Sequence, residues 1–283
     1  MSITDAIPDM EREIRYFPVE DSDPKKLTAE QVQQYNELGY VFPLDVFSPE
    51  EAEANRAYFN ELMEKASAAG LDSYSINGWH NTCEGIYDLL VDKRILDYVE
   101  DLLGENLVAR MSHFFCKIPG DKKQVSWHQD ASYWLLTPTK TVTVWLAIDD
   151  VDEENGPMEV MPGSHLQGQI PFDYSLPEEN NVLRQSVHNV EEFRKPIPFT
   201  LKAGQISIHS DMLLHGSKPN ISDKRRCGLT LRYMPPDVRT RDANQAPAVI
   251  CRGSDPSGYW QHIARPDGDR LPERVNTNKA KRK

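Results

Sequence analysis

Two short patterns place an acidic residue two positions after a histidine: His128 with Asp130, and His209 with Asp211. Alternate side chains of a β-strand point to the same side, so each pattern could present an imidazole and a carboxylate together. Two imidazoles and one carboxylate on one face are the ligand set of many non-haem iron enzymes. With 8 histidines and 44 acidic residues in the chain, roughly one such pattern is expected by chance. A third ligand is needed to choose between the two pairs.

A third ligand is available in the segment LLHGSKPN, where His215 follows an apolar run and precedes a turn. His215 lies far from His128 along the chain, and a jelly roll brings such distant strands together. His215 is less easily placed as the third ligand of the His209 and Asp211 pair, because it follows Asp211 by only four positions. We therefore predict that His128, Asp130 and His215 are the metal ligands and catalytic residues, and that His209 packs nearby without contacting the metal. In the alternative interpretation, His128 is a half-buried strand residue bonded to Asp130, and His215 is an ordinary turn residue.

An arginine that could bind a dicarboxylate follows the third candidate ligand. The guanidinium group can form two parallel hydrogen bonds with a carboxylate. Arg226 begins the predicted strand RCGLTLRYM, and the turn SKPNISDK separates it from His215. The two residues could therefore face one cavity from neighbouring strands. We predict Arg226 as the cosubstrate anchor and Arg225 as a solvated surface residue.

Short β-rich segments separated by Pro, Gly, Asn and Asp dominate the chain after Gly104. The clearest is 141–148, whose alternate positions form two faces that are both apolar enough for burial. Several such segments without strong helices between them are typical of two packed sheets. The fold class predicted is mainly β, a cupin-like jelly roll preceded by helices.

The first hundred residues carry helix signals. Thr28 with Gln31 and Ser48 with Glu51 each form a capping box pattern, and a third helix is predicted from Asp92 to Leu103. One domain is expected, although a length of 283 residues would also fit two small domains; the sequence shows no internal repeat. Its parts are a helical region at about 1–104, a jelly-roll core at about 105–235, and an irregular surface arm at 236–283 that ends in NTNKAKRK.

A long polar segment, 166–196, interrupts the strand signals. Loops of that length in a compact domain are usually lids or binding loops, so this segment is expected to cover a site. Residues expected to form the walls of a substrate pocket are Trp79, His80, Tyr133 and Trp134.

Composition excludes several classes of partner. The net charge of -12 would repel nucleic acid and anionic lipid surfaces. No apolar run is long enough for a membrane span, and the N-terminus lacks a signal-peptide pattern, so a cytoplasmic location is expected. The four cysteines include no Cys-x-x-Cys pair, which indicates reduced thiols.

Three motifs together resemble the phytanoyl-CoA dioxygenase family: WHQDASYW, then TVTVWLAIDDVDEENGPMEVMPGSH, then LLHGSKPNISDKRR. Their order and spacing agree with the family over about 107–233. The resemblance implies a double-stranded β-helix with Fe(II) on the matching residues His128, Asp130 and His215. It also implies that Arg226 binds the distal carboxylate of the cosubstrate 2-oxoglutarate.

The resemblance assigns further residues and a reaction. Ser217, Trp145 and His113 would line the cosubstrate pocket, although a turn hydroxyl and core packing are the alternatives for Ser217 and Trp145. His165 would be structural. The implied reaction uses Fe(II), 2-oxoglutarate and O2 to hydroxylate a C–H bond of a small organic molecule, releasing succinate and CO2.

Other functions remain open at this point. A cupin-like metal-dependent isomerase could use the same three ligands without needing Arg226, and a non-catalytic jelly-roll binding protein could keep the fold alone. Halogenation is disfavoured, because Asp130 would occupy the coordination position that a halide needs. The sequence identifies neither the substrate nor the oligomeric state, and it shows no basic cluster that would seat the phosphates of a CoA thioester.

Overall fold

Seven strands form one large sheet in the computed structural model, which describes residues 2–20, 23–241 and 246–272. The strand order is β1-β10-β5-β12-β2-β14-β15. The bounds are β1 Tyr40–Asp45, β10 Gln205–Ser210, β5 Val142–Ala147, β12 Arg226–Met234, β2 Leu107–Lys117, β14 Ala246–Arg252 and β15 Trp260–His262. Neighbours are antiparallel except for β14 and β15, which are parallel. The middle of the sheet is therefore built from strands that are far apart in sequence.

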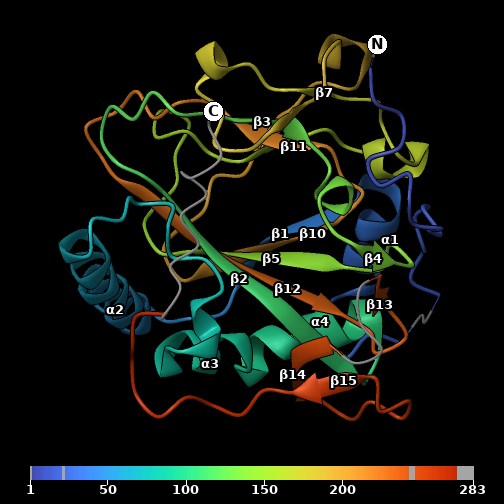
Figure 1. Ribbon diagram of the computed structural model, residues 1–283, viewed down its shortest axis with the longest axis horizontal. Coiled ribbons are helices and arrows are strands. Elements are labelled where there is room, and N and C mark those ends of the chain that lie inside the picture. Colours follow the sequence, from blue (N-terminus) through green and yellow to red (C-terminus); the bar gives the residue numbers. More distant parts are fainter. Residues whose placement is uncertain (1, 21–22, 242–245, 273–283) are drawn as a thin grey trace.

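A smaller sheet of four strands, in the order β3-β11-β6-β9, faces the large one. Its bounds are β3 Val125–His128, β11 His215–Ser217, β6 Glu159–Val160 and β9 Ile197–Pro198. Two short pairs complete the β-structure: β13 Arg239–Thr240 with β4 Leu136–Thr137, and β7 Asp173–Tyr174 with β8 Gln185–Ser186. Figure 1 shows β3 and β11 on one side of the large sheet and α3 and α4 on the other.

The helices are α1 Ala29–Leu38, α2 Pro49–Ala68, α3 Glu84–Leu90 and α4 Lys93–Leu103. Thr28 and Ser48 form the predicted capping boxes, and Asp92 caps α4. Apolar residues of all four helices join the strands of the large sheet in one buried core. The predicted helical signals are therefore confirmed, and α3 is a further helix that the sequence pattern did not reveal.

Strand β5 shows how the two faces of the large sheet differ. Val144 and Leu146 belong to the core on the helical side. Trp145 and Ala147 point the other way and pack with Val160 of the small sheet. All residues of β5 are buried, as the alternation of this segment predicts. The predicted jelly roll with N-terminal helices is confirmed.

Two regions differ from the sequence-based division. The expected irregular arm after residue 235 instead contributes β14 and β15; β14 pairs with β2, and β15 forms the edge of the large sheet. The expected helical region contains β1, which pairs with β10 at the other edge. The sequences of these strands alternate only weakly between apolar and polar residues, so they did not indicate β-structure. Pairing with strands that are distant in sequence stabilises β1 and β14. The basic segment NTNKAKRK lies outside the described residues.

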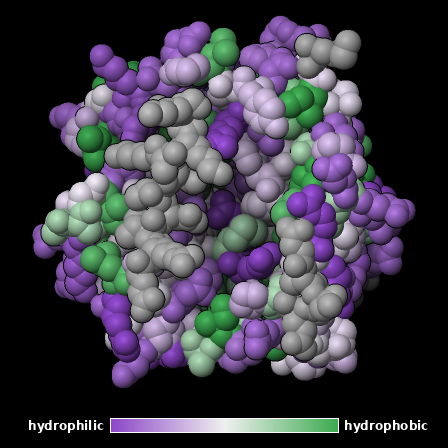
Figure 2. Space-filling view, in the orientation of Figure 1, coloured by the Kyte–Doolittle hydropathy of each residue, from purple (hydrophilic) through white to green (hydrophobic). Residues whose placement is uncertain are grey.

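Surface and thiol features agree with an ordinary globular chain. Among the described helices, none is long and apolar enough to span a membrane. The described part of the face in Figure 2 is mainly hydrophilic, with scattered hydrophobic residues. The four cysteines are free thiols, and three of them are buried.

Candidate metal centre and cosubstrate pocket

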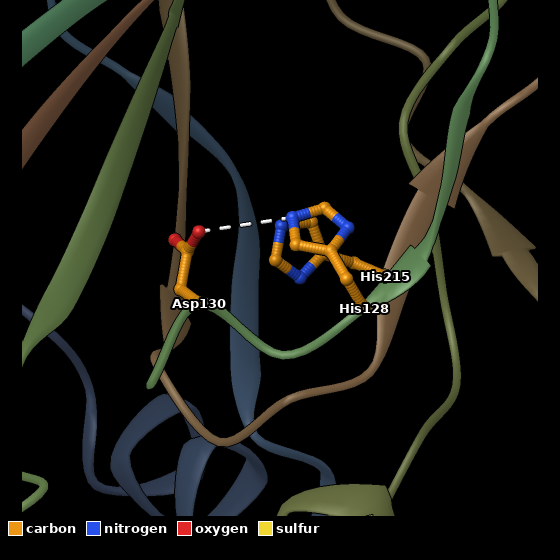
Figure 3. A group of neighbouring side chains, drawn as sticks. All are labelled: His128, Asp130 and His215. Atoms are coloured by element: carbon orange, nitrogen blue, oxygen red, sulfur yellow. Dashed lines mark ion pairs between the residues drawn. The ribbon is translucent and has the colours of Figure 1, made fainter. Parts of the chain in front are cut away.

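Two histidines face each other across the small sheet. His128 ends β3, His215 begins β11, and antiparallel pairing places them directly opposite each other. Their ring centroids lie 4.1 Å apart, and both residues are buried. Figure 3 shows both imidazoles pointing toward Asp130, whose Oδ1 lies 3.7 Å from His128 Nε2. The three predicted ligands therefore converge, with one potential ligand atom from each lying within 4.8 Å of the others.

The backbone at Gln129 explains why His128 and Asp130 point to the same side. Gln129 is extended, with φ -107° and ψ 131°, so the residues on either side of it share a face. Its own side chain turns away, and Nε2 donates to the carbonyl oxygens of Met212 at 2.7 Å and Gly168 at 2.9 Å. These hydrogen bonds fix the segment that carries the two candidate ligands.

Hydrogen bonds on the far side of each imidazole set its tautomer. His128 Nδ1 lies 2.8 Å from the carbonyl oxygen of Ser126, and His215 Nδ1 lies 2.9 Å from that of Leu213. A carbonyl oxygen only accepts, so each Nδ1 carries a proton, and in the neutral tautomer that this fixes the lone pair is on Nε2. Burial, together with His128 and His209, holds the pKa of His215 well below its ordinary value. His215 is therefore in the neutral form that binds metals.

A hydrogen bond to Oδ2, the oxygen of Asp130 that does not face His128, fixes the orientation of the carboxylate. Thr143 Oγ1 donates to Asp130 Oδ2 at 2.9 Å. Burial alone would raise the pKa of Asp130, but Arg232 and the two facing histidines outweigh it and hold that pKa well below its usual range. The ionised Oδ1 and the two Nε2 lone pairs form a donor set that fits Fe(II).

Arg226 lies in the same cavity, buried at the start of β12. Its Nε and Nη2 donate to the carbonyl oxygen of Gly156 at 2.9 and 2.6 Å, and Nη2 also approaches Ser217 Oγ at 3.4 Å. Its Cζ lies 5.7 Å from the ring centroid of Trp145. The structure therefore groups Arg226, Ser217 and Trp145. By contrast, the expectation that Arg225 is a solvated residue is wrong, because it forms a two-armed ion pair with Asp149.

His113 also lines this part of the cavity. Its Nε2 lies 2.8 Å from the carbonyl oxygen of Tyr74, and burial lowers its pKa to about 4. Near Arg226, the fully buried Lys117 donates from Nζ to the carbonyl oxygens of Ser217 and Lys218. Burial lowers the pKa of Lys117 to about 6. Lys117 thus holds the turn that follows His215.

The cavity has a volume of about 640 Å³ and extends from Arg226 past the three candidate ligands. Tyr133 and Trp134 line it, as the sequence predicts, and so do Pro177 and residues 180–183 of the long loop. The loop is attached to the metal-site strand, because Ser126 N donates to Asn181 Oδ1 at 2.9 Å. The loop 166–196 therefore forms part of the cavity wall.

Two expected wall residues lie elsewhere. Trp79 packs in the core on the helical side of the large sheet, and His80 Nδ1 lies 2.7 Å from Ser112 Oγ. Neither lines the cavity, which receives Tyr74, Ser75 and Asn77 from the preceding residues instead. Gly78, in the left-handed conformation with φ +74°, stands between the residues that line the cavity and a short 3-10 helix, Trp79–Asn81. His165 is structural as expected, with Nε2 3.1 Å from the carbonyl oxygen of Asn36.

Sequence reasoning missed part of the surroundings of Asp130. Thr143, His209 and Arg232 lie on three neighbouring strands and all face Asp130 Oδ2, with His209 Nε2 and Arg232 Nε both at 3.9 Å. His209 was expected nearby, and it does line the cavity. Thr143 and Arg232 gave no signal, because only the pairing register of β5 and β12 brings them together.

Comparisons with known proteins agree with this geometry. The family model for phytanoyl-CoA dioxygenase (PhyH) matches residues 35–228. A probable alpha-ketoglutarate-dependent hypophosphite dioxygenase from Stutzerimonas stutzeri is 27% identical over 230 residues, covering 74% of this chain and 79% of that protein. The ectoine dioxygenase of Bordetella bronchiseptica is 25% identical over 241 residues, covering 73% and 75%. The solved structure of the non-heme monooxygenase ThoJ, without ligand, is 27% identical, with a TM-score of 0.73 and coverage of 84% and 88%.

Fold and relatives define the class of the protein as a non-haem dioxygenase that depends on Fe(II), 2-oxoglutarate and O2. The chain belongs to the phytanoyl-CoA dioxygenase family. The family resemblance stated from the three motifs is therefore confirmed.

Proposed function

We propose that His128, Asp130 and His215 bind Fe(II) in this dioxygenase. The observation that carries the proposal is the convergence of two imidazoles and one ionised carboxylate on one buried point. Each Nδ1 is already committed to a backbone carbonyl, so Nε2 is the atom available for the metal. Thr143 keeps Asp130 Oδ2 occupied and leaves Oδ1 for coordination.

Arg226 and Ser217 would receive the distal carboxylate of 2-oxoglutarate. The Nε and Nη2 of Arg226 both donate to the carbonyl oxygen of Gly156, and these two hydrogen bonds fix the orientation of the guanidinium before a ligand binds. Trp145 and His113 would form the walls beside the carbon chain. When bound, iron and 2-oxoglutarate supply the chemistry that hydroxylates a C–H bond and yields succinate and CO2. The chain's own contribution is to orient both partners and to exclude water from the buried cavity.

The primary substrate is proposed to be a small organic molecule. Relatives are named for hypophosphite, ectoine and phytanoyl-CoA, so membership of the family leaves the substrate undetermined. We also propose that the chain is a single dioxygenase domain that acts in the cytoplasm, with neither nucleic acid nor membrane as a partner. The acidic net charge of -12 supports that proposal.

The requirement for Arg226 separates this proposal from an isomerase or a binding protein with the same fold. The test is calorimetric titration of 2-oxoglutarate into Zn(II)-loaded protein, which cannot turn over. Arg226→Met should raise the Kd for 2-oxoglutarate roughly 10- to 100-fold, because a charge-assisted hydrogen bond is lost. Arg225→Met is the matched control, since that neighbouring guanidinium is bound to Asp149 outside the cavity. Equal affinity in the native protein and Arg226→Met would refute the assignment of Arg226.

A further inference from the structure

A row of side chains crosses the large sheet at the opposite end of the cavity from Arg226. His209 on β10 and Arg232 on β12 both pair with Thr143 on β5, and Arg232 pairs with Met111 on β2. All four residues line the cavity. Arg226 and Arg232 share one face of β12, because their positions differ by an even number. The cavity therefore contains two buried guanidinium groups, one at each end.

The Nε of Arg232 lacks a hydrogen-bond partner among the described residues, although the side chain is almost completely buried, with 10% exposed. Its ion-pair partner, Asp130 Oδ2, lies 3.9 Å from Nε, which is too far for a hydrogen bond, and this oxygen already accepts from Thr143. The ring centroid of Trp134 lies 5.3 Å from its Cζ and holds the group on one side. A buried cation left in this state is costly, and a ligand that accepts its hydrogen bonds would remove that cost.

The charges around the cavity also call for an anion. Among its lining residues, Lys123 and Asp72 form an ion pair at 3.4 Å and neutralise each other. The charged lining residues that remain are two guanidinium groups, Arg226 and Arg232, and one carboxylate, Asp130. Fe(II) and the 2-oxoglutarate dianion have opposite formal charges that cancel. One positive charge is left without a counter-ion, and it lies at the end of the cavity where Arg232 is found.

We propose that Arg232 binds an oxyanion of the primary substrate, so that the substrate class is small organic acids carrying a carboxylate or a phosphonate. This inference rests on the proposed metal and cosubstrate sites. The planar guanidinium has several N–H groups and can bridge Asp130 and a second oxyanion. Met111 and Trp134 beside it provide apolar surface for the rest of the molecule. Since Arg232 lies 3.9 Å from a carboxylate oxygen of a candidate metal ligand, the C–H bond that reacts is within a few bonds of the acid group.

The experiment measures binding in the whole protein loaded with Zn(II) and 2-oxoglutarate, which does not turn over. The probes for calorimetry are butanoate, octanoate, benzoate and methylphosphonate, each compared with its neutral amide or methyl ester. The variants are Arg232→Met and Arg232→Lys, the second retaining the charge in case the first is unstable. Arg184→Met is the matched control, because it removes an exposed positive charge from the loop segment that borders the cavity.

We expect at least one oxyanion to bind the native protein roughly tenfold or more tightly than its neutral partner, which is the contribution of a charge-assisted hydrogen bond. Arg232→Met should abolish that preference, Arg232→Lys should retain part of it, and Arg184→Met should retain all of it. The Kd for 2-oxoglutarate, measured separately, should stay unchanged in Arg232→Met. This second titration separates the failure of the substrate proposal from the failure of the cosubstrate site.

Three results would overturn the inference. One is equal binding of each acid and its neutral partner, or no binding of any probe, in native protein that binds 2-oxoglutarate. Another is an acid preference that survives in folded Arg232→Met. The third is a raised Kd for 2-oxoglutarate in both Arg232 variants, which would show that the guanidinium serves a carboxylate of the cosubstrate instead.

Discussion

A single methyl group at Gly228 should disturb the cosubstrate pocket through Trp145. A Cβ at Gly228 would lie 1.9 Å from Cζ2 and 2.2 Å from Cε2 of the indole. Contacts of real Cβ atoms are not closer than about 3.0 Å, so the ring must move by about 1.1 Å, the difference between 3.0 and 1.9 Å. Trp145 packs against the buried core between the sheets on one side and lines the cavity on the other, so the indole ring can move only into the cavity. The ring would then move relative to Arg226.

The expected size of the effect follows from two opposing contributions to stability. Overpacking costs about 1 to 3 kcal/mol, and replacing glycine by alanine in a strand regains about 0.5 to 1 kcal/mol. Gly228→Ala should therefore lower the free energy of unfolding by up to about 2.5 kcal/mol, and by about 1 kcal/mol at the middle of the two ranges. The Arg226–Trp145 contact is worth up to about 2 kcal/mol in a dry site, so its disturbance should raise the Kd for 2-oxoglutarate about 10-fold.

Urea unfolding and 2-oxoglutarate titration of the Zn(II)-loaded protein measure the two effects separately. Trp145→Phe supplies the control, because the indole atoms that clash with the new methyl group are absent from phenylalanine. The double variant should therefore lose less stability than the sum of the single variants. A Gly228→Ala protein with native stability and native affinity would refute this description of the pocket, and so would strictly additive losses.

Further predictions concern the metal ligand, a buried acid and the metal-site turn. Thr143→Val removes the hydrogen bond to Asp130 Oδ2 and should weaken Fe(II) binding about 10-fold, measured by competition with a chelator; unchanged affinity would contradict a role for Thr143. Burial raises the pKa of Asp211 from 3.8 to about 8. Between pH 3.8 and 8 the folded state therefore binds more protons than the unfolded state, and the free energy of unfolding falls as the pH rises. Asp211→Asn should therefore gain up to about 3 kcal/mol relative to the native protein between pH 5.5 and 7.5 in urea unfolding, and parallel pH profiles would contradict this. Lys117→Met should remove the bonds to the Ser217 and Lys218 carbonyls and raise the Kd for 2-oxoglutarate several-fold; native affinity would show that the turn holds without Lys117.

Local patterns in the sequence predicted what local geometry decides. The extended backbone at Gln129 makes the His128-x-Asp130 spacing meaningful, and the capping boxes at Thr28 and Ser48 begin real helices. The alternation in β5 identified two buried faces. These features depend on residues within a few positions of each other, which a pattern can capture.

Features that depend on strand pairing were beyond the sequence. The row of His209, Thr143 and Arg232 exists because of the register between β10, β5 and β12, and no spacing along the chain encodes it. Trp79 belongs to the core and does not line the cavity, although its neighbour Asn77 does, and no pattern along the chain distinguishes the two positions. Strand β1 lies at one edge of the large sheet and β14 lies next to the other edge strand, β15; β1 pairs with β10 and β14 with β2, both far away in sequence, so the segments themselves carried little signal.

The most direct test of the central claim is anaerobic absorption spectroscopy of the protein with Fe(II) and then 2-oxoglutarate. A metal centre formed by His128, Asp130 and His215 leaves positions for the two donor oxygens of 2-oxoglutarate, and this chelate produces a weak visible metal-to-ligand charge-transfer band. The band should appear in the native protein and be absent from His215→Ala that is shown to be folded. Its absence from folded, iron-loaded native protein, or its persistence in His215→Ala, would contradict the proposed site.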